Sequence, residues 1–405
     1  MPKPLDGVKV IELGTLIAGP FCTRILGEFG AEVIKIEAPG EGDPLRSWRK
    51  LYQGTSLWWY VQGRNKQSVA INLKHPEGVV IIRKLVREAD IVVENFRPGV
   101  LEKLGLGWEV LSAENPGLVM VRLSGFGQSG PYKNQAGFGA VGEAMGGLRY
   151  TTGFPDRPPV RTGISIGDSI AALWAAIGAL MALRHREVDG GKGQVVDVAL
   201  YEAVFAMMES LVPEFDVLGF VRERSGNVMP GITPSSTHTT RDGKHLIIGA
   251  NGDAIFRRFM QAIGRTDLAD DPGLSSNAGR DLRAAELYAL IDAWVAGHDA
   301  DHVLKLLAEV QVPASPLYSV ADMFRDPQFL ARGMLETAHL PDGKEFNVPG
   351  IVPKLSETPG ATEWLGPRLG EHTEAVLASV GYAADEIERL CAEGAVARLA
   401  EKSSG

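Results

Sequence analysis

The stretch Val8–Glu37, VKVIELGTLIAGPFCTRILGEFGAEVIKIE, decides the fold. It contains two short β-branched runs, residues 8–13 and 32–37, which are bounded by turn residues and predict strands. Between them, residues 18–30 carry apolar side chains at helical spacing. A strand, a helix and a strand in this order predict parallel strands joined by a helix that covers the sheet.

The same alternation continues along the first half of the chain. Residues 68–73, 90–96 and 118–126 predict three more strands, and residues 75–89 predict a helix with Pro76 and Glu77 in its first turn. Strands that alternate with helices form a mostly parallel sheet with both faces covered. We therefore expect an α/β fold with a Rossmann-like large domain, in which ligands bind where the strand order reverses.

The later sequence predicts a second, smaller domain. Composition shifts to Gly, Pro and Ser near residues 221–236, and residues 340–366 are again rich in Pro and Gly. Between these segments, a hairpin with a strand precedes helices near 253–264, 282–297 and 300–310. We expect a large domain over residues 1–212, a linker over 213–236, a small α/β domain over 237–332, a linker over 333–366, and C-terminal helices over 367–405 that return to the large domain.

Composition limits the class of protein. The chain has 405 residues, of which 45% are apolar and 22% charged, as in a soluble globular protein. A net charge of −9 gives a nucleic-acid partner no electrostatic support. Cys22 and Cys391 are too few for a disulfide framework or a metal cluster. The apolar run Ser169–Leu183 is shorter than a bilayer span. We expect a cytoplasmic protein without a membrane partner.

The stretch Arg161–Leu173, RTGISIGDSIAAL, places Asp168 directly before an apolar run. Aspartate is a preferred N-cap, so Asp168 is expected to cap a helix of roughly 18 residues. A carboxylate at a helix N-terminus also stays ionised and has N–H donors beside it, as a nucleophile with an oxyanion site requires. The local pattern leaves both roles open.

Other motifs give weaker signals. No dinucleotide fingerprint follows the first strand, the Gly-x-Gly-x-x-Gly letters at residues 125–130 precede a loop instead of a helix, and a Walker loop is missing. His298 and His302 have the spacing of a metal pair but lack a third ligand nearby, so we predict no metal site. The Gly-x-Ser-x-Gly letters around Ser165 follow a Pro-rich approach, which leaves a hydrolase as a minor alternative.

Two segments lie where an open sheet receives ligands. Asn95, Arg97 and Lys103 follow the fourth predicted strand, where Arg and Lys suit phosphate or carboxylate groups. They equally suit a solvated helix start with Pro98 in its first turn. The glycine-rich segment 124–140 follows the fifth strand and predicts either close ligand approach or tight turns.

Taken together, these segments resemble the family III CoA-transferases. The resemblance rests on LDGVKVIELGTLIAGPFCTRILGEFGAEVIKIE, GRNKQSVAINLK, ADIVVENFRPGVLEKLGLG, LSGFGQSGPYKNQAGF, TGISIGDSIAALWAAIGALMAL and GKGQVVDVALYEAV. They cover most of residues 4–212, and the similarity is weaker in the small domain.

The resemblance implies a nucleophilic role for Asp168. Its carboxylate would attack an acyl-CoA thioester, form an aspartyl mixed anhydride, and then form an aspartyl-CoA thioester. Coenzyme A is then a substrate, and no tightly bound cofactor is expected. The partners would be an acyl-CoA, a small carboxylic acid and a second copy of the chain in an interlocked homodimer. The implied CoA-binding residues are Ile17, Ala18, Ile71, Asn72, Leu73, Lys74, Asn95, Phe96, Arg97, Lys103, Gln135, Ala136, Gly137, Phe138 and Gly139.

Departures from relatives narrow the function. Ile17 and Ala38 replace a glutamine and an arginine of the formyl-CoA branch, and Phe138 replaces the racemase histidine and cannot abstract a proton. We expect CoA transfer from a donor such as succinyl-CoA to a dicarboxylate, whose distal carboxylate Arg46, Arg49 or Arg64 could hold. The alternatives are an isomerase that moves CoA within one unsaturated dicarboxylyl-CoA and a non-catalytic CoA-binding protein.

Overall fold

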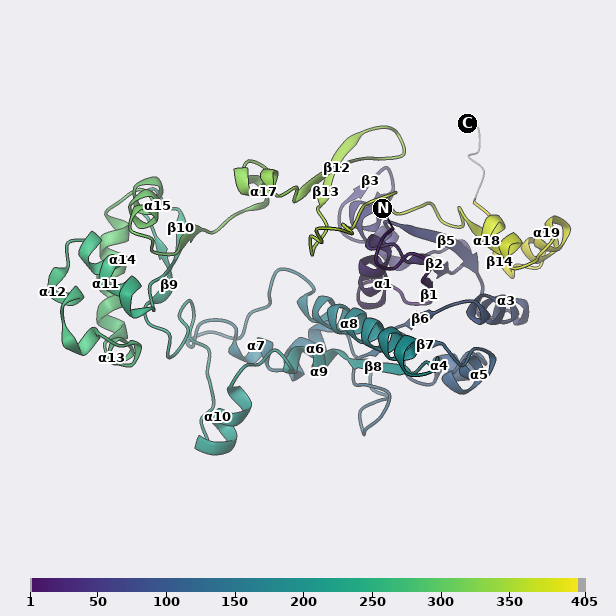
Figure 1. The fold of residues 1–405 in the computed structure, drawn as a ribbon, viewed down its shortest axis with the longest axis horizontal. Helices are drawn as coiled ribbons and strands as arrows, with labels where there is room; N and C mark the ends of the chain where they lie inside the picture. The colour runs from purple at the N-terminus through teal and green to yellow at the C-terminus, as the bar shows by residue number, and fades with distance from the viewer. Residues whose placement is uncertain (1, 400–405) are drawn as a thin grey trace. The chain divides into compact units, whose positions relative to one another are not determined.

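The computed structural model describes residues 2–399 and divides them into two compact units (Figure 1). The large unit comprises residues 2–148, 162–213 and 333–399. The small unit comprises residues 149–161 and 214–332. The chain therefore leaves the large unit twice and returns to it twice.

A seven-stranded sheet forms the centre of the large unit. Its strands are β1 (Lys9–Glu12), β2 (Glu32–Glu37), β5 (Lys66–Ile71), β6 (Ile91–Glu94), β7 (Val119–Ser124), β8 (Val195–Ala199) and β14 (Val396–Ala397). They lie in the order β14-β5-β2-β1-β6-β7-β8, and every adjacent pair is parallel except β14 with β5. The predicted mixed α/β fold with a mainly parallel sheet is confirmed.

The strand order identifies the edge at which ligands are expected. Counted along the chain from β1, the parallel strands lie in the order 3-2-1-4-5-6, which reverses between β1 and β6. In open α/β sheets, ligands bind outside the carboxyl ends of the strands at such a reversal. The loops that leave β1, β6 and β7 therefore border the edge at which a ligand is expected.

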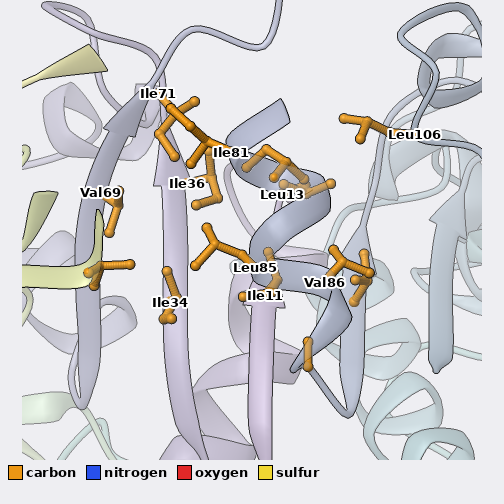
Figure 2. Packing of buried hydrophobic residues seen from close by; sticks show 14 of the residues in the cluster. Ile11, Leu13, Ile34, Ile36, Val69, Ile71, Ile81, Leu85, Val86 and Leu106 are labelled. Carbon is orange, nitrogen blue, oxygen red and sulfur yellow. The ribbon is translucent and has the colours of Figure 1, made fainter. Parts of the chain in front are cut away.

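Helices cover both faces of this sheet. They are α1 (Ala18–Glu28), α3 (Pro76–Arg87), α5 (Trp108–Glu114), α8 (Ile166–Val188), α18 (Thr373–Ser379) and α19 (Ala384–Ala392). Neighbouring strand residues alternate between two cores: Val10 packs with α1 and α8, whereas Ile11 packs with α3, as Figure 2 shows for the second core. Sheet and helices thus bury two apolar layers.

Helix α8 lies in the first of these cores. Its buried side consists mostly of alanines, including Ala172, Ala175 and Ala179, which let the helix approach α1 and the sheet closely. By length and composition alone this helix could also span a membrane. Its packing against α1, β7, β8 and α9 (Leu200–Phe205) identifies it as a core helix of the large unit.

Short elements complete the large unit. They are a 3-10 helix (Pro44–Ser47), β3 (Leu51–Tyr52), β4 (Thr55–Ser56), α2 (Leu57–Gln62), α4 (Val100–Lys103), α6 (Gly139–Met145) and the hairpin β12 (Leu335–His339) and β13 (Glu345–Pro349). Two further helices, α7 (Leu148–Thr151) and α10 (Leu211–Leu218), lie at the boundaries between the units. The segments expected as linkers therefore carry structure: residues 333–366 contain the hairpin, and α10 reaches into residues 213–236.

The small unit contains a three-stranded antiparallel sheet in the order β11-β10-β9. Its strands are β9 (Ser235–Thr239), β10 (His245–Gly249) and β11 (Ala314–Pro316). Its helices are α11 (Asp253–Ala262), α12 (Thr266–Ala269), α13 (Asn277–Leu282), α14 (Ala284–Ala296), α15 (Ala300–Glu309), α16 (Val320–Met323) and α17 (Pro327–Ala331), with a 3-10 helix at Pro272–Leu274. One apolar core, which includes Phe256, Phe259 and Ile291, joins the sheet to these helices.

Candidate active site

Asp168 lies inside the first turn of α8 as its third residue. The predicted N-cap role is wrong, because Ser165 is the N-cap and its carbonyl already accepts the Ser169 N–H at 3.1 Å. The helix is also longer than predicted, with 23 residues. A first-turn carboxylate still experiences the positive end of the helix dipole, which stabilises its ionised form.

Gly139 makes room for the Asp168 carboxylate. A Cβ atom added at Gly139 would lie 2.0 Å from Asp168 Oδ2 and 2.5 Å from Cγ. The half-buried carboxylate therefore rests directly against the buried backbone at the start of α6. No side chain other than hydrogen fits at residue 139 while Asp168 keeps this position.

The loop that leads to Gly139 crosses itself at two glycines. A Cβ at Gly125 would lie 2.8 Å from Gly137 Cα, and one at Gly137 would lie 2.7 Å from Gly125 Cα. The glycine-rich segment after β7 therefore forms a close backbone crossing, which neither of its two sequence interpretations, close ligand approach or tight turns, had described. Gln135, Ala136 and Phe138, implied as CoA contacts, are exposed on this loop.

Asn95 joins two of the loops at this edge of the sheet. Its Oδ1 accepts the Thr15 N–H at 2.8 Å, and its Nδ2 donates to the Thr15 carbonyl at 2.8 Å. The Asn95 amide, which was implied as a CoA contact, therefore ties the loop after β6 to the loop after β1.

The neighbouring Glu94 is a buried carboxyl with an unusual pKa. Burial raises the pKa of Glu94 to about 7, although the Arg122 guanidinium, whose Nε donates to Glu94 Oε1 at 2.7 Å, opposes this shift. Glu94 Oε2 accepts the Phe96 N–H at 2.7 Å. The backbone of the loop after β6 is thus anchored on a group that titrates near neutral pH.

Three cations implied as CoA-binding residues are exposed, and two of them, Arg97 and Lys103, were implied for the phosphate groups. Lys74, Arg97 and Lys103 have no ion-pair partner in residues 2–399, so their charges are available to an anionic ligand. Ile71, the last residue of β5, instead packs in the apolar core between the sheet and α3. Asn72 stabilises its own turn, because its Oδ1 accepts the Lys74 N–H at 3.0 Å.

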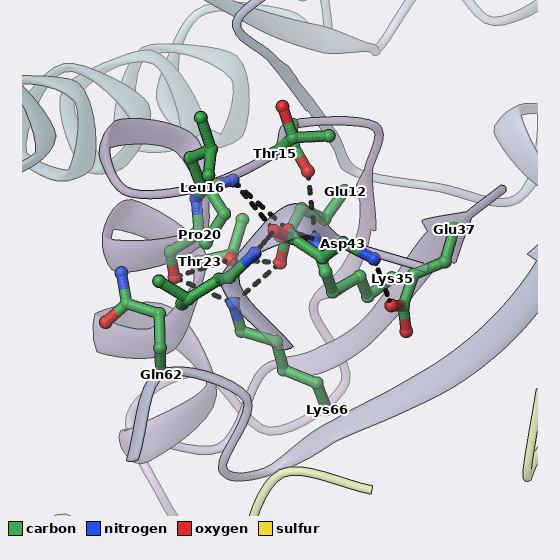
Figure 3. Close-up of polar contacts among 12 residues, drawn as sticks. Glu12, Thr15, Leu16, Pro20, Thr23, Lys35, Glu37, Asp43, Gln62 and Lys66 are labelled. Carbon is green, nitrogen blue, oxygen red and sulfur yellow. Dashed lines mark hydrogen bonds and ion pairs between the residues drawn. The ribbon is translucent and has the colours of Figure 1, made fainter. Parts of the chain in front are cut away.

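A buried charge network lies below the loop after β1 (Figure 3). Glu12 accepts from Lys35 Nζ at 2.7 Å, from Lys66 Nζ at 2.8 Å and from the Thr23 hydroxyl at 2.5 Å. Lys35 Nζ also lies 2.8 Å from Asp43 Oδ2. Two carboxylates thus balance two ammonium groups inside the large unit.

The network holds the loop in a conformation that non-glycine residues rarely adopt. Asp43 accepts the Leu16 N–H at 3.1 Å, and Leu16 has a φ of 67°. Burial alone would raise the pKa of Asp43, but the Lys35 ammonium and the Leu45 and Leu16 N–H groups outweigh it and lower that pKa. The pKa of Glu12 is lowered similarly, because Lys35 and Lys66 outweigh its burial.

Sequence reasoning missed this network, although a signal existed. A central strand of a parallel sheet is buried on both faces. Charged residues nevertheless occur in three such strands, KVIE, EVIKIE and KQSVAI. Charges at such positions must be paired, since an isolated buried charge is strongly unfavourable.

A cavity of about 420 Å³ adjoins the turn that carries Asp168. We call it the arginine pocket. It is lined by Ile17, Phe21, Arg24, Arg49, Trp58, Gln62, Gly163, Ile164, Ser165 and Ser169. Its lining includes Ser165 and Ser169, which flank Asp168 in the sequence and, four residues apart, share one face of the helix. Of the residues implied to bind CoA, Ile17 contributes to this wall.

Only one of the three arginines considered for a distal carboxylate lines the arginine pocket. Arg46 is paired with Glu37 at 2.7 Å and stacks on Trp59, and Arg64 is buried with its Nε 2.6 Å from Glu28. The guanidinium groups of Arg46 and Arg64 are therefore already engaged in contacts within the protein. Arg49 faces the pocket, together with Arg24, which sequence reasoning did not single out.

The paired histidines of the small unit pack on each other. The His298 and His302 rings stack with centroids 4.8 Å apart, and His298 Nδ1 lies 2.7 Å from the Trp294 carbonyl. Within the described residues, no group of three or more His, Cys, Asp or Glu side chains is placed to hold a metal ion.

Comparison with known proteins decides the family. The family model described as CoA-transferase family III matches residues 5–373. The chain belongs to CoA-transferase family III. This membership agrees with the resemblance seen in the large unit and extends it through the small unit.

Named relatives cover almost the whole chain. A Chloroflexus aurantiacus protein named succinyl-CoA–D-citramalate CoA-transferase is 51% identical over 97% of this chain and 98% of its own. The protein named succinyl-CoA–L-malate CoA-transferase alpha subunit, also from Chloroflexus aurantiacus, is 43% identical over 96% of this chain and 91% of its own. A crystal structure of a CaiB/BaiF family protein from Brucella suis matches with a TM-score of 0.82 at 35% identity, covering 94% of this chain and 100% of that one.

Proposed function

We propose that this CoA-transferase moves CoA from succinyl-CoA to a small dicarboxylic acid, with Asp168 as the nucleophile. The names of the relatives support the donor and the class of acceptor, since both name succinyl-CoA and a dicarboxylate. The observation that carries the proposal is the half-buried Asp168 carboxylate, set in the first turn of α8 against the bare backbone of Gly139.

The proposed reaction conserves the acyl-transfer potential of the thioester. An Asp168 oxygen attacks the donor carbonyl carbon, the C–S bond breaks, and CoA leaves as a thiolate. The thiolate attacks the aspartyl carbonyl of the resulting anhydride, which forms an aspartyl-CoA thioester and releases succinate. The acceptor carboxylate then attacks the aspartyl-CoA thioester, which expels the CoA thiolate and forms a second mixed anhydride. The thiolate attacks the acceptor carbonyl of this anhydride, which yields the acceptor's CoA ester and frees the Asp168 carboxylate. The covalent intermediates divide the transfer into easier steps, so each activation barrier is lower than that of direct attack by the acceptor on the donor thioester.

Other residues of the large unit bind the substrate in this proposal. The exposed cations Lys74, Arg97 and Lys103 attract the CoA phosphates, because their charges lack protein partners within the described chain. The glycine-rich loop before Gly139 contacts the pantetheine arm and the thiol. A Rossmann-like organisation of the large unit agrees with the place of these loops, because ligands of such folds bind where the strand order reverses.

A substrate panel tests the proposal. The purified protein is incubated with succinyl-CoA and, in turn, citramalate, malate, glutarate and butyrate, and each new CoA ester is identified by mass. We expect CoA esters of the dicarboxylates. The Asp168→Asn variant should form none of them, and its unfolding temperature should equal that of the wild type. Hydroxylamine added during turnover should convert the activated Asp168 into its hydroxamate.

The same assay separates the alternatives. Transfer by Asp168→Asn at the wild-type rate, or absence of the hydroxamate during turnover, would contradict the nucleophilic role. Rearrangement of one unsaturated dicarboxylyl-CoA without an acceptor would indicate an isomerase. CoA binding without any exchange would indicate a binding protein.

We also propose that the chain forms a cytoplasmic homodimer. An apolar row on α8 supports a partner surface: Leu173, Trp174, Ile177, Leu180 and Met181 are all between 40% and 67% exposed. One relative is named as a subunit, which agrees with an assembly of such chains. The family resemblance further implies that the two subunits interlock.

A further inference from the structure

We propose that the arginine pocket binds the distal carboxylate of the acyl group, with Arg49 and Arg24 as the specificity-determining residues. This inference rests on the proposed CoA transfer and assigns the part of the site that recognises a dicarboxylate. Its ligand is an acid with two carboxyl groups separated by a short apolar chain.

The charges around the pocket favour an anion. Arg24 and Arg49 are the charged residues of its lining, which contains no carboxylate. The buried Glu28, which is not part of the lining, pairs with two arginines. Its Oε1 lies 2.9 Å from Arg24 Nε and 2.6 Å from Arg64 Nε. One carboxylate therefore faces two guanidinium groups, and the local positive charge is only partly neutralised.

Arg24 has unused hydrogen-bonding capacity. Its Nε is buried and lies within ion-pair distance of Glu28, but without the geometry of a hydrogen bond. Its Nη1 makes one long hydrogen bond, 3.5 Å, to Gln62 Oε1. Burial lowers the pKa of Arg24 to about 10, with Glu28 opposing this shift and Arg64 adding to it. A substrate carboxylate would supply a further hydrogen-bond acceptor for Arg24 and a second negative charge beside that of Glu28.

Aromatic rings orient both guanidinium groups. The Arg24 guanidinium lies 4.6 Å from the centre of the Phe21 ring, and that of Arg49 lies 5.4 Å from the centre of a Trp58 ring. A ring that occupies one face of a guanidinium leaves its N–H edge free for bidentate binding of a carboxylate. Arg49 also has a φ of 65°, a conformation that non-glycine residues rarely adopt and that concentrates at functional sites.

The remaining wall suits the carbon chain. Ile17, Phe21, Trp58 and Ile164 provide apolar surface in the same cavity that the two arginines, Ser165 and Ser169 line. A cavity of about 420 Å³ falls within the range of small-molecule sites, roughly 300–1,000 Å³. Donor and acceptor occupy the same acyl position in the proposed reaction, so both must carry the distal carboxylate.

The test compares donors that differ in the distal carboxylate alone. Succinyl-CoA and butyryl-CoA are each mixed with excess enzyme in the absence of an acceptor, and release of the free acid, succinate or butyrate, is followed in a single turnover. Acid release reports the acylation of Asp168, because the CoA thiolate returns to the anhydride and stays on the enzyme as the aspartyl-CoA thioester. We expect Arg49→Gln to lower the acylation rate at low substrate with succinyl-CoA by about 10- to 100-fold. With butyryl-CoA we expect a change below about threefold, because this donor lacks the group that Arg49 binds.

Two further variants control for charge and folding. Arg49→Lys should recover part of the rate with succinyl-CoA, because it keeps a positive charge without the bidentate edge. Lys50→Gln removes a neighbouring exposed charge outside the pocket lining and should leave both donors unaffected. Arg24→Gln should act like Arg49→Gln, and a thermal melt of that variant reports whether loss of the Glu28 pair also lowers stability.

The outcomes separate this inference from the proposed function. If the wild type exchanges CoA but Arg49→Gln slows both donors equally, or slows neither, the arginine pocket does not read the distal carboxylate. If the wild type exchanges no CoA with any donor, the proposed function itself has failed. A selective loss with succinyl-CoA supports the assignment.

Discussion

The position of the Asp168 carboxylate depends on the missing side chain of Gly139. Even a methyl group there would overlap Asp168 Oδ2, which lies 2.0 Å from the position of an added Cβ. We therefore expect Gly139→Ala to displace the carboxylate and to lower CoA transfer by at least about 100-fold, since misplacement by about 1 Å can cost that much. The measurement is the initial rate with succinyl-CoA and the best acceptor.

A second glycine provides the control for this substitution. Gly249 ends a strand of the small unit, has no atom within 4 Å of an added Cβ, and has no left-handed φ. Gly249→Ala should keep the wild-type rate. If Gly139→Ala is equally active, the carboxylate does not need its place against the backbone of residue 139.

Asp168 also shows what sequence can establish about one residue. Its place near the N-terminus of an apolar helix was predictable, because a carboxylate between a glycine and an apolar run is typical of a helix start. Its exact position in the helix was not, because the start of a helix depends on which carbonyl accepts the first hydrogen bond, and Ser165 accepts it here. The contact with Gly139 depends on tertiary packing and leaves no local signal.

At the scale of elements, the charge network couples β1, β2 and β5 to the loop before Ile17. Lys35→Met would leave Glu12 and Asp43 with one ammonium group, Lys66, instead of two. Removal of one partner from a buried ion pair typically costs about 3–5 kcal/mol, so we expect that loss in the free energy of unfolding, measured in urea. Lys9→Met removes an exposed pair with Glu88 and should cost about 1 kcal/mol or less.

The network also predicts how stability depends on pH. The pKa values of Glu12 and Asp43 are lower in the folded protein than in the unfolded chain, so the unfolded chain binds more protons as the pH falls. The contribution of these carboxylates is present above their unfolded pKa values of about 4, and it is lost as the pH falls through their lowered pKa values in the folded protein. We expect the free energy of unfolding to fall less steeply with acid in the double variant Glu12→Gln/Asp43→Asn than in the wild type. Parallel slopes would show that the two carboxyls titrate normally.

The elements themselves were largely predictable. The bounds of the five strands and two helices predicted over residues 8–126 agree with the structure within a few residues, because these strands are rich in β-branched residues and bounded by turn residues. The hairpin β12–β13 was missed, because Pro and Gly in its sequence are typical of linkers and its two strands pair only with each other. The edge strand β14 has two residues, which are too few for any periodic signal.

At the scale of the whole molecule, the exposed row on α8 argues for a partner. The row combines residues at positions i, i+1, i+4, i+7 and i+8, so it follows one side of a helix whose other side is buried in the core. A soluble monomer rarely exposes such a continuous apolar strip. A second copy of the chain would cover it.

The oligomeric state tests this argument, and Ile177 is the place to test it. Ile177 is 41% exposed, so Ile177→Asp should leave the fold intact while it places a charge in the proposed contact. In sedimentation we expect the wild type at twice the 43.5 kDa of one chain and Ile177→Asp at the mass of one chain. Val80→Asp, on the exposed side of α3, introduces the same charge outside the row and should remain dimeric. A monomeric wild type would remove the proposed dimer, whereas a dimeric Ile177→Asp variant would place its interface away from α8.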